Sequence, residues 1–578
     1  MSIWKVYAKK ADFKAIGARF GINQVIARII RNRDVTEDSQ YEEYLYGGLE
    51  SMHDPALMKG ISEAVAVIKN AIADGKRIRI IGDYDIDGVC SICILHKGLI
   101  MAGADADYVV PDRITDGYGI NENLIRNAIA DGIDMIITCD NGIAAYDAIA
   151  YAKENGITII VTDHHDVPFR ENADGTREYI IPPADVVVDP KQSDCGYPFK
   201  ELCGALVAWK MIQHLLGQKP KDSEFLMYLL ELGAIATVGD IVSLQGENRT
   251  IVKQGLRHIH AGTRNVGLKT LMDVCGVAEA DFNAYHIGFV VGPCLNASGR
   301  LDSAVKAIRL LETDDEKQAQ ALAAELKLLN DERKDMTERG VENACNTVER
   351  EYGNNIPQII VVHLDNCHES VAGIIAGRVR EKYYRPCIIF TDSIGEHGIY
   401  KGSGRSIEPY DMFAGVNRFR DMLEKFGGHH MAAGMSIRSE RFEEFRECLV
   451  NSMDMSDEEL TPVTWIDVPM PLDYVTEEVT EQLQLLEPFG KDNPKPVFAD
   501  KNLTVVRKNI IGKNRNVLKM ILQTVNGRRL EAVKFHVTQE EADNMKTGDI
   551  ISIVYYPDIN TFNGNSTCLL YTSPSPRD

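Results

Sequence analysis

Five short apolar runs alternate with stretches of helical pattern between about residues 60 and 190. The runs are IRIIG at 78–82, DYVVP at 107–111, MIITC at 135–139, TIIVT at 158–162 and DVVVD at 185–189. This βαβ rhythm predicts an α/β fold, with a mostly parallel sheet covered by helices on both faces. In such sheets, ligands bind beyond the carboxyl ends of the strands. We assign residues 61–313 to this domain and residues 1–60 to an N-terminal cap segment.

The pattern changes three times further along the chain. Residues 314–351 are rich in Ala, Leu, Glu and Lys, and Leu322, Leu326 and Leu329 share one helical face, which predicts a long connecting helix. Residues 352–452 repeat the α/β pattern and form a second domain. After an acidic linker, short β-rich runs in 462–578 predict a small barrel, for which an OB-fold is one candidate. The final YTSPSPRD breaks the strand pattern, so we expect a truncated last strand.

Composition indicates an ordinary globular protein. The 578 residues are 44% hydrophobic and 26% charged, enough for roughly three or four domains. The chain begins without a signal peptide, and no apolar run approaches the ~18 residues of a membrane span, so we expect a cytoplasmic location and no membrane partner. Among 12 cysteines, Cys90 and Cys93 form one CxxC pair, for which packing on a helix is favoured over a zinc or redox role.

The net charge of −22 argues against a protein that coats nucleic acid, because phosphate binding normally needs a basic surface. One segment differs. Between Lys501 and Lys534, nine basic residues accompany one acidic residue, Glu531. This basic run is either a local DNA-binding surface or a solvated strand face. The second alternative stays open because the run contains no aromatic residue on which bases could stack.

Carboxylates follow the first predicted strand directly. Asp83, Asp85 and Asp87 lie within five residues, and divalent cations would relieve the repulsion between them. Helix capping by Asp87 explains one aspartate and leaves two unexplained. The next strands end in Asp140 and in Asp163-His164-His165, and carboxylates mixed with imidazoles suit Mn²⁺ or a similar ion. Asp240, after another apolar segment, is either a helix cap or a further ligand.

Six motifs carry a resemblance to a known family. GDYDIDG (82–88), CDNGI (139–143), VTDHHDVP (161–168) and ATVGDIVSL (236–244) are similar to the four signature motifs of DHH phosphoesterases. GSGRS (402–406) and FGGHHMAAG (426–434) are similar to motifs of the DHH-associated domain. Their order and spacing, together with YPFKELCGALVAWK at 197–210, resemble the RecJ family in particular.

The resemblance implies roles for individual residues. Two ions, Mn²⁺ or Mg²⁺, would be held by six ligands, and Asp140 would bridge both ions. Asp140, His164 and His165 would be catalytic, with His165 facing the scissile phosphate. Arg113, Arg300, Ser403 and Arg405 would bind a substrate phosphate, and His429 would meet substrate unless its glycine-rich motif is only a packing turn. The implied metal ligands are Asp83, Asp85, Asp87, Asp140, His164 and Asp240.

The resemblance also implies an activity. It indicates a metal-dependent phosphodiesterase, a single-stranded-DNA-specific 5′→3′ exonuclease that releases 5′-mononucleotides in DNA repair and recombination. Single-stranded DNA is the expected partner, with a helicase and a single-strand-binding protein as further candidates, because the chain has no Walker A motif for its own unwinding. The alternatives are a DHH oligoribonuclease, a cyclic-dinucleotide phosphodiesterase and a non-catalytic scaffold. Three departures from the family pattern are Ile81 in place of His, Asp189 in place of Asn and Ser370 in place of Gly.

Overall fold

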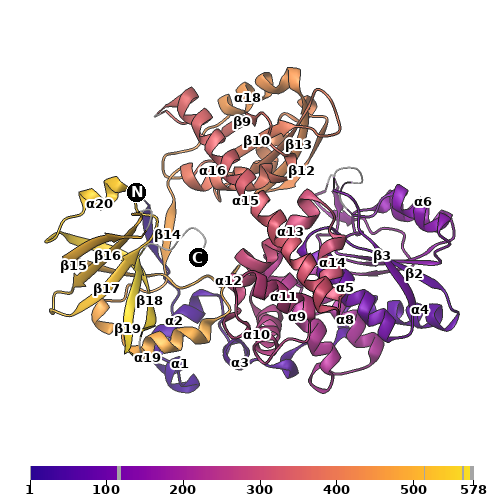
Figure 1. Ribbon diagram of the computed structural model, residues 1–578, viewed down its shortest axis with the longest axis horizontal. Helices are drawn as coiled ribbons and strands as arrows, with labels where there is room; N and C mark the ends of the chain where they lie inside the picture. Colours follow the sequence, from indigo (N-terminus) through magenta and orange to yellow (C-terminus); the bar gives the residue numbers. More distant parts are fainter. Residues whose placement is uncertain are drawn as a thin grey trace. The chain divides into compact units, whose positions relative to one another are not determined.

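The computed structural model of the chain describes residues 2–113, 117, 119–172, 174–353, 355–512, 515–562 and 565–572 (Figure 1). The chain forms two compact units. The α/β unit comprises His53–Val242 and Gly255–Pro462, and the barrel unit comprises Met1–Met52, Ser243–Gln254 and Val463–Asp578. Within the described ranges, no helix combines the length and the apolar character needed to cross a membrane.

A five-stranded parallel sheet forms the first half of the α/β unit, as predicted. Its strand order is β3 (Asp105–Val109), β2 (Arg77–Ile81), β4 (Met135–Cys139), β5 (Thr158–Thr162) and β8 (Val186–Val188). The chain passes from β2 to β3 on one side and then returns to place β4 on the other side. At such a reversal the loops after the two central strands diverge, and ligands bind between them. These are the loops that carry Asp83–Asp87 and Asp140.

Helices cover both faces of this sheet because both faces of its strands are apolar. On one face, α6 (Glu122–Ala130) and α7 (Tyr146–Glu154) bury leucines, isoleucines and alanines against the strands. On the other, α5 (Ile86–Met101) packs against α8 (Gly204–Leu216) and α9 (Glu224–Gly239). Then α11 (Val266–Val274), α13 (Gly292–Leu301) and α14 (Val305–Glu312) lead to the predicted connecting helix, α15 (Glu316–Tyr352), whose 37 residues span about 55 Å.

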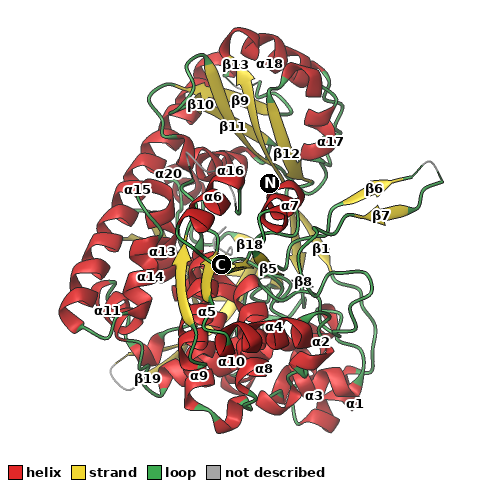
Figure 2. Cartoon of the chain, turned by 90° about the vertical axis from the view of Figure 1, so that its right-hand side faces the viewer, coloured by secondary structure: helices red, strands yellow, loops and turns green. Residues whose placement is uncertain are grey.

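The second half of the α/β unit contains a mixed sheet (Figure 2). Its order is β12 (Lys425–His429), β13 (Ala432–Arg438), β11 (Ile399–Arg405), β10 (Cys387–Asp392) and β9 (Ile360–Leu364). Apolar side chains of α15 and α16 (Ala372–Tyr383) pack on one face, and those of α17 (Met412–Asn417) and α18 (Phe442–Asn451) pack on the other. The glycine-rich GSGRS motif lies at the end of β11.

The barrel unit closes with strands in the order β15 (Phe498–Ile511), β16 (Val517–Gln523), β17 (Arg529–Lys534), β19 (Asn565–Thr572) and β18 (Ile550–Phe562). The last strand, β19, pairs with β17 as far as Tyr571 and with β18 as far as Thr572. Of the segment YTSPSPRD, where the sequence led us to expect a truncated strand, Tyr571 and Thr572 belong to β19. Residues 573–578 lie outside the described ranges.

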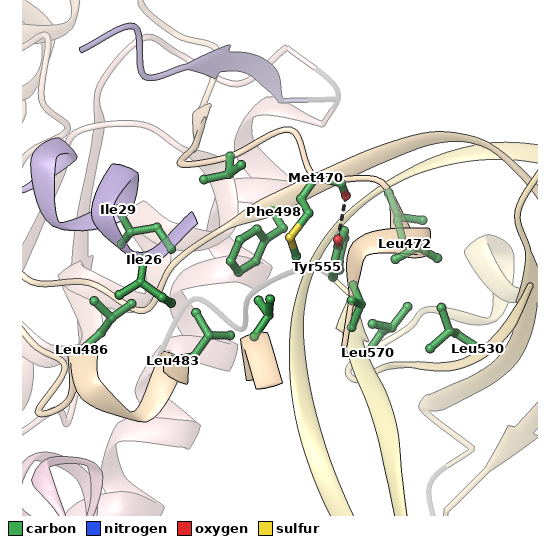
Figure 3. Packing of buried hydrophobic residues seen from close by; sticks show 14 of the residues in the cluster. Ile26, Ile29, Met470, Leu472, Leu483, Leu486, Phe498, Leu530, Tyr555 and Leu570 are labelled. Atoms are coloured by element: carbon green, nitrogen blue, oxygen red, sulfur yellow. Dashed lines mark hydrogen bonds between the residues drawn. The ribbon is translucent and has the colours of Figure 1, made fainter. Parts of the chain in front are cut away.

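Residues 1–52 belong to the barrel unit and do not form a separate cap segment. Ile26 and Ile29 of α2 (Gln24–Asn32) lie in one apolar core with barrel residues such as Phe498 and Tyr555 (Figure 3). The Tyr555 hydroxyl donates a 2.7 Å hydrogen bond to the carbonyl of Met470. β1 (Ile3–Val6) also pairs in parallel with β14 (Val463–Ile466). A pattern read along the chain does not reveal a pairing across so long a separation.

Candidate metal centre

The loop after β2 presents its carboxylates from the start of α5. Asp85, and not Asp87, caps this helix: its Oδ1 accepts hydrogen bonds from the backbone N–H groups of Asp87 (2.9 Å) and Gly88 (3.1 Å). Asp83 is buried, and its Oδ1 accepts no hydrogen bond from the described residues. Burial, followed by the charge of Asp85, raises the pKa of Asp83 to about 8. A buried carboxylate oxygen without a donor is a suitable ligand for a divalent cation.

Asp87 is held by the N-terminus of another helix. Its two carboxylate oxygens accept hydrogen bonds from the backbone N–H groups of Gly204 (2.6 Å) and Ala205 (2.7 Å), which begin α8. Burial, and then the charge of Asp85, raise the pKa of Asp87 to about 6, although these two hydrogen bonds act in the opposite direction. The positive end of α8 therefore orients and stabilises one carboxylate of the loop.

Asp140 and His164 occupy the centre of the site. Asp140 follows β4 with a φ of 59°, in the left-handed region, so its side chain leaves the strand direction. His164 Nε2 lies 3.1 Å from Asp140 Oδ1, 3.5 Å from Asp87 Oδ2 and 3.7 Å from Asp240 Oδ2. Burial, and next the neighbouring carboxylates, raise the pKa of Asp140 well above its ordinary value.

The structure brings all six predicted ligands together; we call them the metal cluster. Ligand atoms lie within 4.8 Å of one another in each of three sets, and Asp140 and His164 each belong to two. Five carboxylates surround one imidazole in the metal cluster, and Asp83 Oδ1 has no hydrogen-bond donor among the described residues. Such a set of ligands fits hard or borderline ions such as Mg²⁺ and Mn²⁺. The three sets are Asp83, Asp85 and Asp140; Asp87, His164 and Asp240; and Asp140, His164 and His165.

His165 is oriented by Asp163, a residue whose role the sequence analysis did not predict. His165 Nδ1 lies 2.7 Å from Asp163 Oδ1, and Asp163 also accepts hydrogen bonds from the backbone N–H groups of Ile143, His164 and His165. Burial alone would lower the pKa of His165, but the hydrogen bond and charge of Asp163 raise it to about 9. In the metal-free site, these interactions favour the protonated form of His165, and 46% of its side chain is exposed.

Three arginines lie beside the metal cluster. The Arg113 guanidinium lies 5.0 Å above the ring of Tyr84, which separates Asp83 from Asp85 in the loop. Burial, and then the positive charge of Arg113, lower the pKa of Arg300 to about 10. Burial, Arg380 and Arg113 likewise lower the pKa of Arg405. Arg113 therefore lies close enough to repel both Arg300 and Arg405, as expected of an anion site, and the three are here called the arginine cluster.

Neighbouring residues position the arginine cluster. Arg405 donates to Ser403 Oγ at 3.2 Å, and a Cβ on Gly373 would approach both side chains to within 2.8 Å. Arg300 donates to the backbone carbonyl of Ser370 at 3.2 Å, so this departure from the family pattern still supplies an acceptor. His429 is exposed at the end of β12, two strands from Arg405 in the same row of the sheet. The structure does not bring His429 into the cluster.

The structure also locates two cysteines and an aspartate that the sequence singled out. Cys90 and Cys93 are fully buried in α5, and burial raises the pKa of both thiols well above its usual value, so the packing interpretation is confirmed. Asp189 is also buried, and burial followed by the charge of Asp163 raises its pKa to about 8. Its Oδ2 accepts no hydrogen bond from the described residues.

The basic run is only partly available to a ligand. Lys519 and Lys534 form ion pairs of 2.6 and 2.9 Å with Glu531 and Glu541. Other members bind within the barrel: Arg528 and Lys508 donate to backbone carbonyls, and Arg529 donates to Gln523. Lys513 lies outside the described residues. The exposed remainder is Lys501, Arg507 and Arg515.

The sequence matches family models along most of its length. The matches are the DHH family, N-terminal domain, over residues 77–237, the DHHA1 domain over residues 357–453, and the RecJ OB domain over residues 466–572. The predicted fold class, including its OB-like barrel, is thereby confirmed.

Individual relatives agree with the family models. The single-stranded-DNA-specific exonuclease RecJ of Bacillus subtilis (strain 168) is 35% identical over 563 residues, which cover 97% of this chain and 69% of that protein. The crystal structure of RecJ from Thermus thermophilus with Mn²⁺ is similar with a TM-score of 0.81, at 26% identity over 99% of this chain and 79% of that chain. The corresponding Mg²⁺ complex gives a TM-score of 0.76, at 25% identity over 99% and 78%. These are the two ions that the sequence predicted. The chain therefore belongs to the RecJ family.

Proposed function

We propose that the chain is a single-stranded-DNA-specific exonuclease that uses two divalent ions and degrades DNA in the 5′→3′ direction. One observation carries this proposal: Tyr84, between two residues of the metal cluster, lies under Arg113 of the arginine cluster. The loop that carries metal ligands thus also contacts the proposed anion site. This arrangement suits an enzyme that holds a terminal phosphate while it cleaves the adjacent phosphodiester bond.

In the proposed mechanism, the six residues of the metal cluster would hold Mn²⁺ or Mg²⁺. When bound, such ions activate water and stabilise charge on the attacking and leaving oxygens. Water oxygen adds to phosphorus, and the P–O3′ bond of the terminal nucleotide breaks. His165, oriented by Asp163, would supply positive charge or a proton on the exposed side of the metal cluster.

The arginine cluster would account for the 5′→3′ direction of degradation. Cleavage of the P–O3′ bond releases a 5′-mononucleotide and leaves a new 5′-phosphate on the shortened strand. The same recognition group is therefore regenerated in every cycle. Arg113, Arg300, Ser403 and Arg405 would bind this phosphate, because guanidinium groups match phosphate oxygens in bidentate geometry.

The proposed biological role is DNA repair and recombination. The OB domain and the exposed cations of the basic run would track single-stranded DNA. A helicase and a single-strand-binding protein are the proposed partners, since either would provide single-stranded substrate. These roles rest on the family and on the substrate chemistry proposed for the site.

End-labelled oligonucleotides test the activity. DNA and RNA, single and double stranded, with a 5′-phosphate or a 5′-hydroxyl, would be incubated with Mn²⁺, Mg²⁺ or EDTA. We expect mononucleotides from single-stranded DNA, degradation from the 5′ end, preference for the 5′-phosphate and no product in EDTA. Degradation from the 3′ end, or faster hydrolysis of short RNA, would favour the oligoribonuclease alternative.

A further inference from the structure

Two thiols face each other in the helical region of the α/β unit. Cys275 ends α11 and is half-buried, whereas Cys294 lies in the first turn of α13 and is fully buried. Their sulfur atoms are 3.9 Å apart, and both cysteines are free. Cys275 is therefore partly accessible from solvent, and the buried Cys294 lies within contact distance of it.

The surroundings favour reaction at Cys275. Asn330 donates a 3.4 Å hydrogen bond to the Cys294 sulfur, which holds that side chain in place. The hydrogen bond with Cys294 lowers the pKa of Cys275 to about 7; Lys327 and Lys334 act in the same direction, and burial and Asp331 oppose them. The two lysines and the hydrogen bond with Cys294 therefore favour the thiolate of Cys275, and the thiolate is the reactive form of a cysteine.

We propose that Cys275 and Cys294 are an oxidisable pair that forms an intramolecular disulfide on exposure to a peroxide. The Cys275 thiolate attacks one peroxide oxygen, the O–O bond breaks, and hydroxide is released. Cys275 is then a sulfenic acid. Cys294 sulfur then attacks the Cys275 sulfur, the S–O bond breaks, and water leaves. Two thiols have lost two electrons and two protons, and the peroxide has been reduced to two waters. A dithiol reverses the reaction by exchange.

The disulfide would alter α13. The sulfur atoms must approach from 3.9 Å to about 2.05 Å, which moves the first turn of this helix. The next turns carry Asn296, whose Oδ1 accepts the backbone N–H of Ile86 at 2.8 Å, and then Arg300. On the proposed function, oxidation should therefore reduce exonuclease activity several-fold by displacing the metal loop and the arginine cluster.

Peptide mapping tests the pair without reference to activity. The full chain would be treated with hydrogen peroxide at neutral pH, alkylated, digested without reduction and analysed by mass spectrometry. We expect a cross-linked peptide joining Cys275 to Cys294 that dithiothreitol removes. The exposed Cys448 supplies the control, since Cys448→Ser should form the same cross-link at the same rate. Cys275→Ser and Cys294→Ala should each abolish it.

Sulfinic acid at Cys275 without a cross-link, or an unmodified Cys275, would overturn the proposal. Two variants are used because Cys294 is buried and its replacement alone can perturb folding; Cys275→Ser changes a half-exposed position. Activity would be measured on the same samples before and after dithiothreitol. A cross-link in a protein without nuclease activity would support the pair and contradict the proposed function, so the two failures are distinguishable.

Discussion

The backbone N–H of Gly204 lies 2.6 Å from Oδ2 of Asp87, a residue that precedes it by 117 positions. This hydrogen bond joins the start of α8 to the loop after β2, across the sheet edge where the metal cluster lies. Gly204 also lies directly beside Asp140: a Cβ built on it would be 2.7 Å from the Asp140 Cβ and 3.0 Å from its Cα. The absence of a side chain at position 204 therefore allows the two carboxylates to meet.

Gly204→Ala should impair metal binding while the chain still folds. Because the added methyl group must displace Asp140 or the start of α8, we expect Mn²⁺ affinity to fall about tenfold or more, with a parallel loss of hydrolysis. Isothermal titration calorimetry and hydrolysis assays would measure both. The control is Gly377→Ala in α16, where an added Cβ meets no atom within 4 Å. Normal affinity in Gly204→Ala would contradict the packing argument.

Asp140→Ala should abolish hydrolysis. Asp140 belongs to two of the three ligand sets, so its loss removes a carboxylate from both proposed ion sites. We expect activity to fall by about a hundredfold or more, with single-stranded DNA binding retained. Hydrolysis and fluorescence anisotropy would be compared with those of Asp174→Ala, which changes an exposed aspartate between β6 (Phe169–Glu171) and β7 (Arg177–Tyr179). Substantial Mn²⁺-dependent activity in Asp140→Ala would refute the ligand assignment.

The metal-free protein should lose stability as the pH rises from about 6.5 to 8. Unfolded aspartates release their protons near pH 4, whereas burial raises the pKa of Asp83 to about 8 and that of Asp240 to about 7 in the folded chain. His165, whose pKa is raised to about 9, contributes stability that is present below pH 6.5 and lost above it. The folded state thus binds more protons in this window, so the free energy of unfolding falls with pH.

Urea unfolding at pH 6.5, 7.25 and 8 would measure this decline in EDTA and in Mg²⁺. Bound cations replace the protons, so the stabilisation by Mg²⁺ should be larger at pH 8 than at pH 6.5. Asp83→Asn should flatten the dependence in EDTA, because the amide does not titrate. The Cys275 thiol, with its pKa of about 7, acts in the opposite direction, and Cys275→Ser would steepen the decline. A free energy that rises with pH in EDTA would contradict this account.

Arg405→Ala should affect 5′-phosphorylated substrates most. Loss of a charge-assisted contact predicts a decrease in kcat/KM of about tenfold to a few hundredfold on 5′-phosphorylated single strands, and a smaller loss on 5′-hydroxyl strands. Steady-state kinetics on both substrates would separate the two effects. Arg438→Ala removes an exposed arginine of the same domain, paired with Glu424, and should change neither value. Equal losses on both substrates would count against the phosphate site.

The exposed cations of the basic run should contribute to the salt dependence of DNA binding. Replacing Lys501, Arg507 and Arg515 with Gln should reduce the slope of log K against log salt by about 2, since each phosphate contact on a single strand contributes about 0.7. Dinucleotide cleavage should be unaffected. The matched control replaces three exposed lysines of the α/β unit, Lys69, Lys219 and Lys317. An unchanged slope would favour the alternative interpretation, in which the basic run is a solvated strand face without a role in DNA binding.

Local sequence patterns predicted those features that depend on local chemistry. Apolar runs predicted the parallel strands, and the residues after them predicted the metal cluster, because parallel strands deliver their ends to one sheet edge. Features that depend on distant contacts were not predictable. Gly204 is an ordinary helix residue until α8 lies against Asp87, and Asp163 becomes an orienting residue only through its hydrogen bonds to His165 and Ile143. The basic run shows the same limit, since its Lys519–Glu531 ion pair depends on the register of two strands.

The parallel pairing of β1 with β14 has a consequence for synthesis on the ribosome. Ile3 pairs with Val463, so 460 residues separate the two partners. At about 5–20 residues per second, roughly half a minute to a minute and a half elapses between their appearance. During that interval Ile26 and Ile29 have been made, but the barrel residues that bury them have not. The nascent chain therefore carries an exposed apolar segment while the α/β unit folds, and this segment is a binding site for a chaperone that recognises exposed apolar side chains.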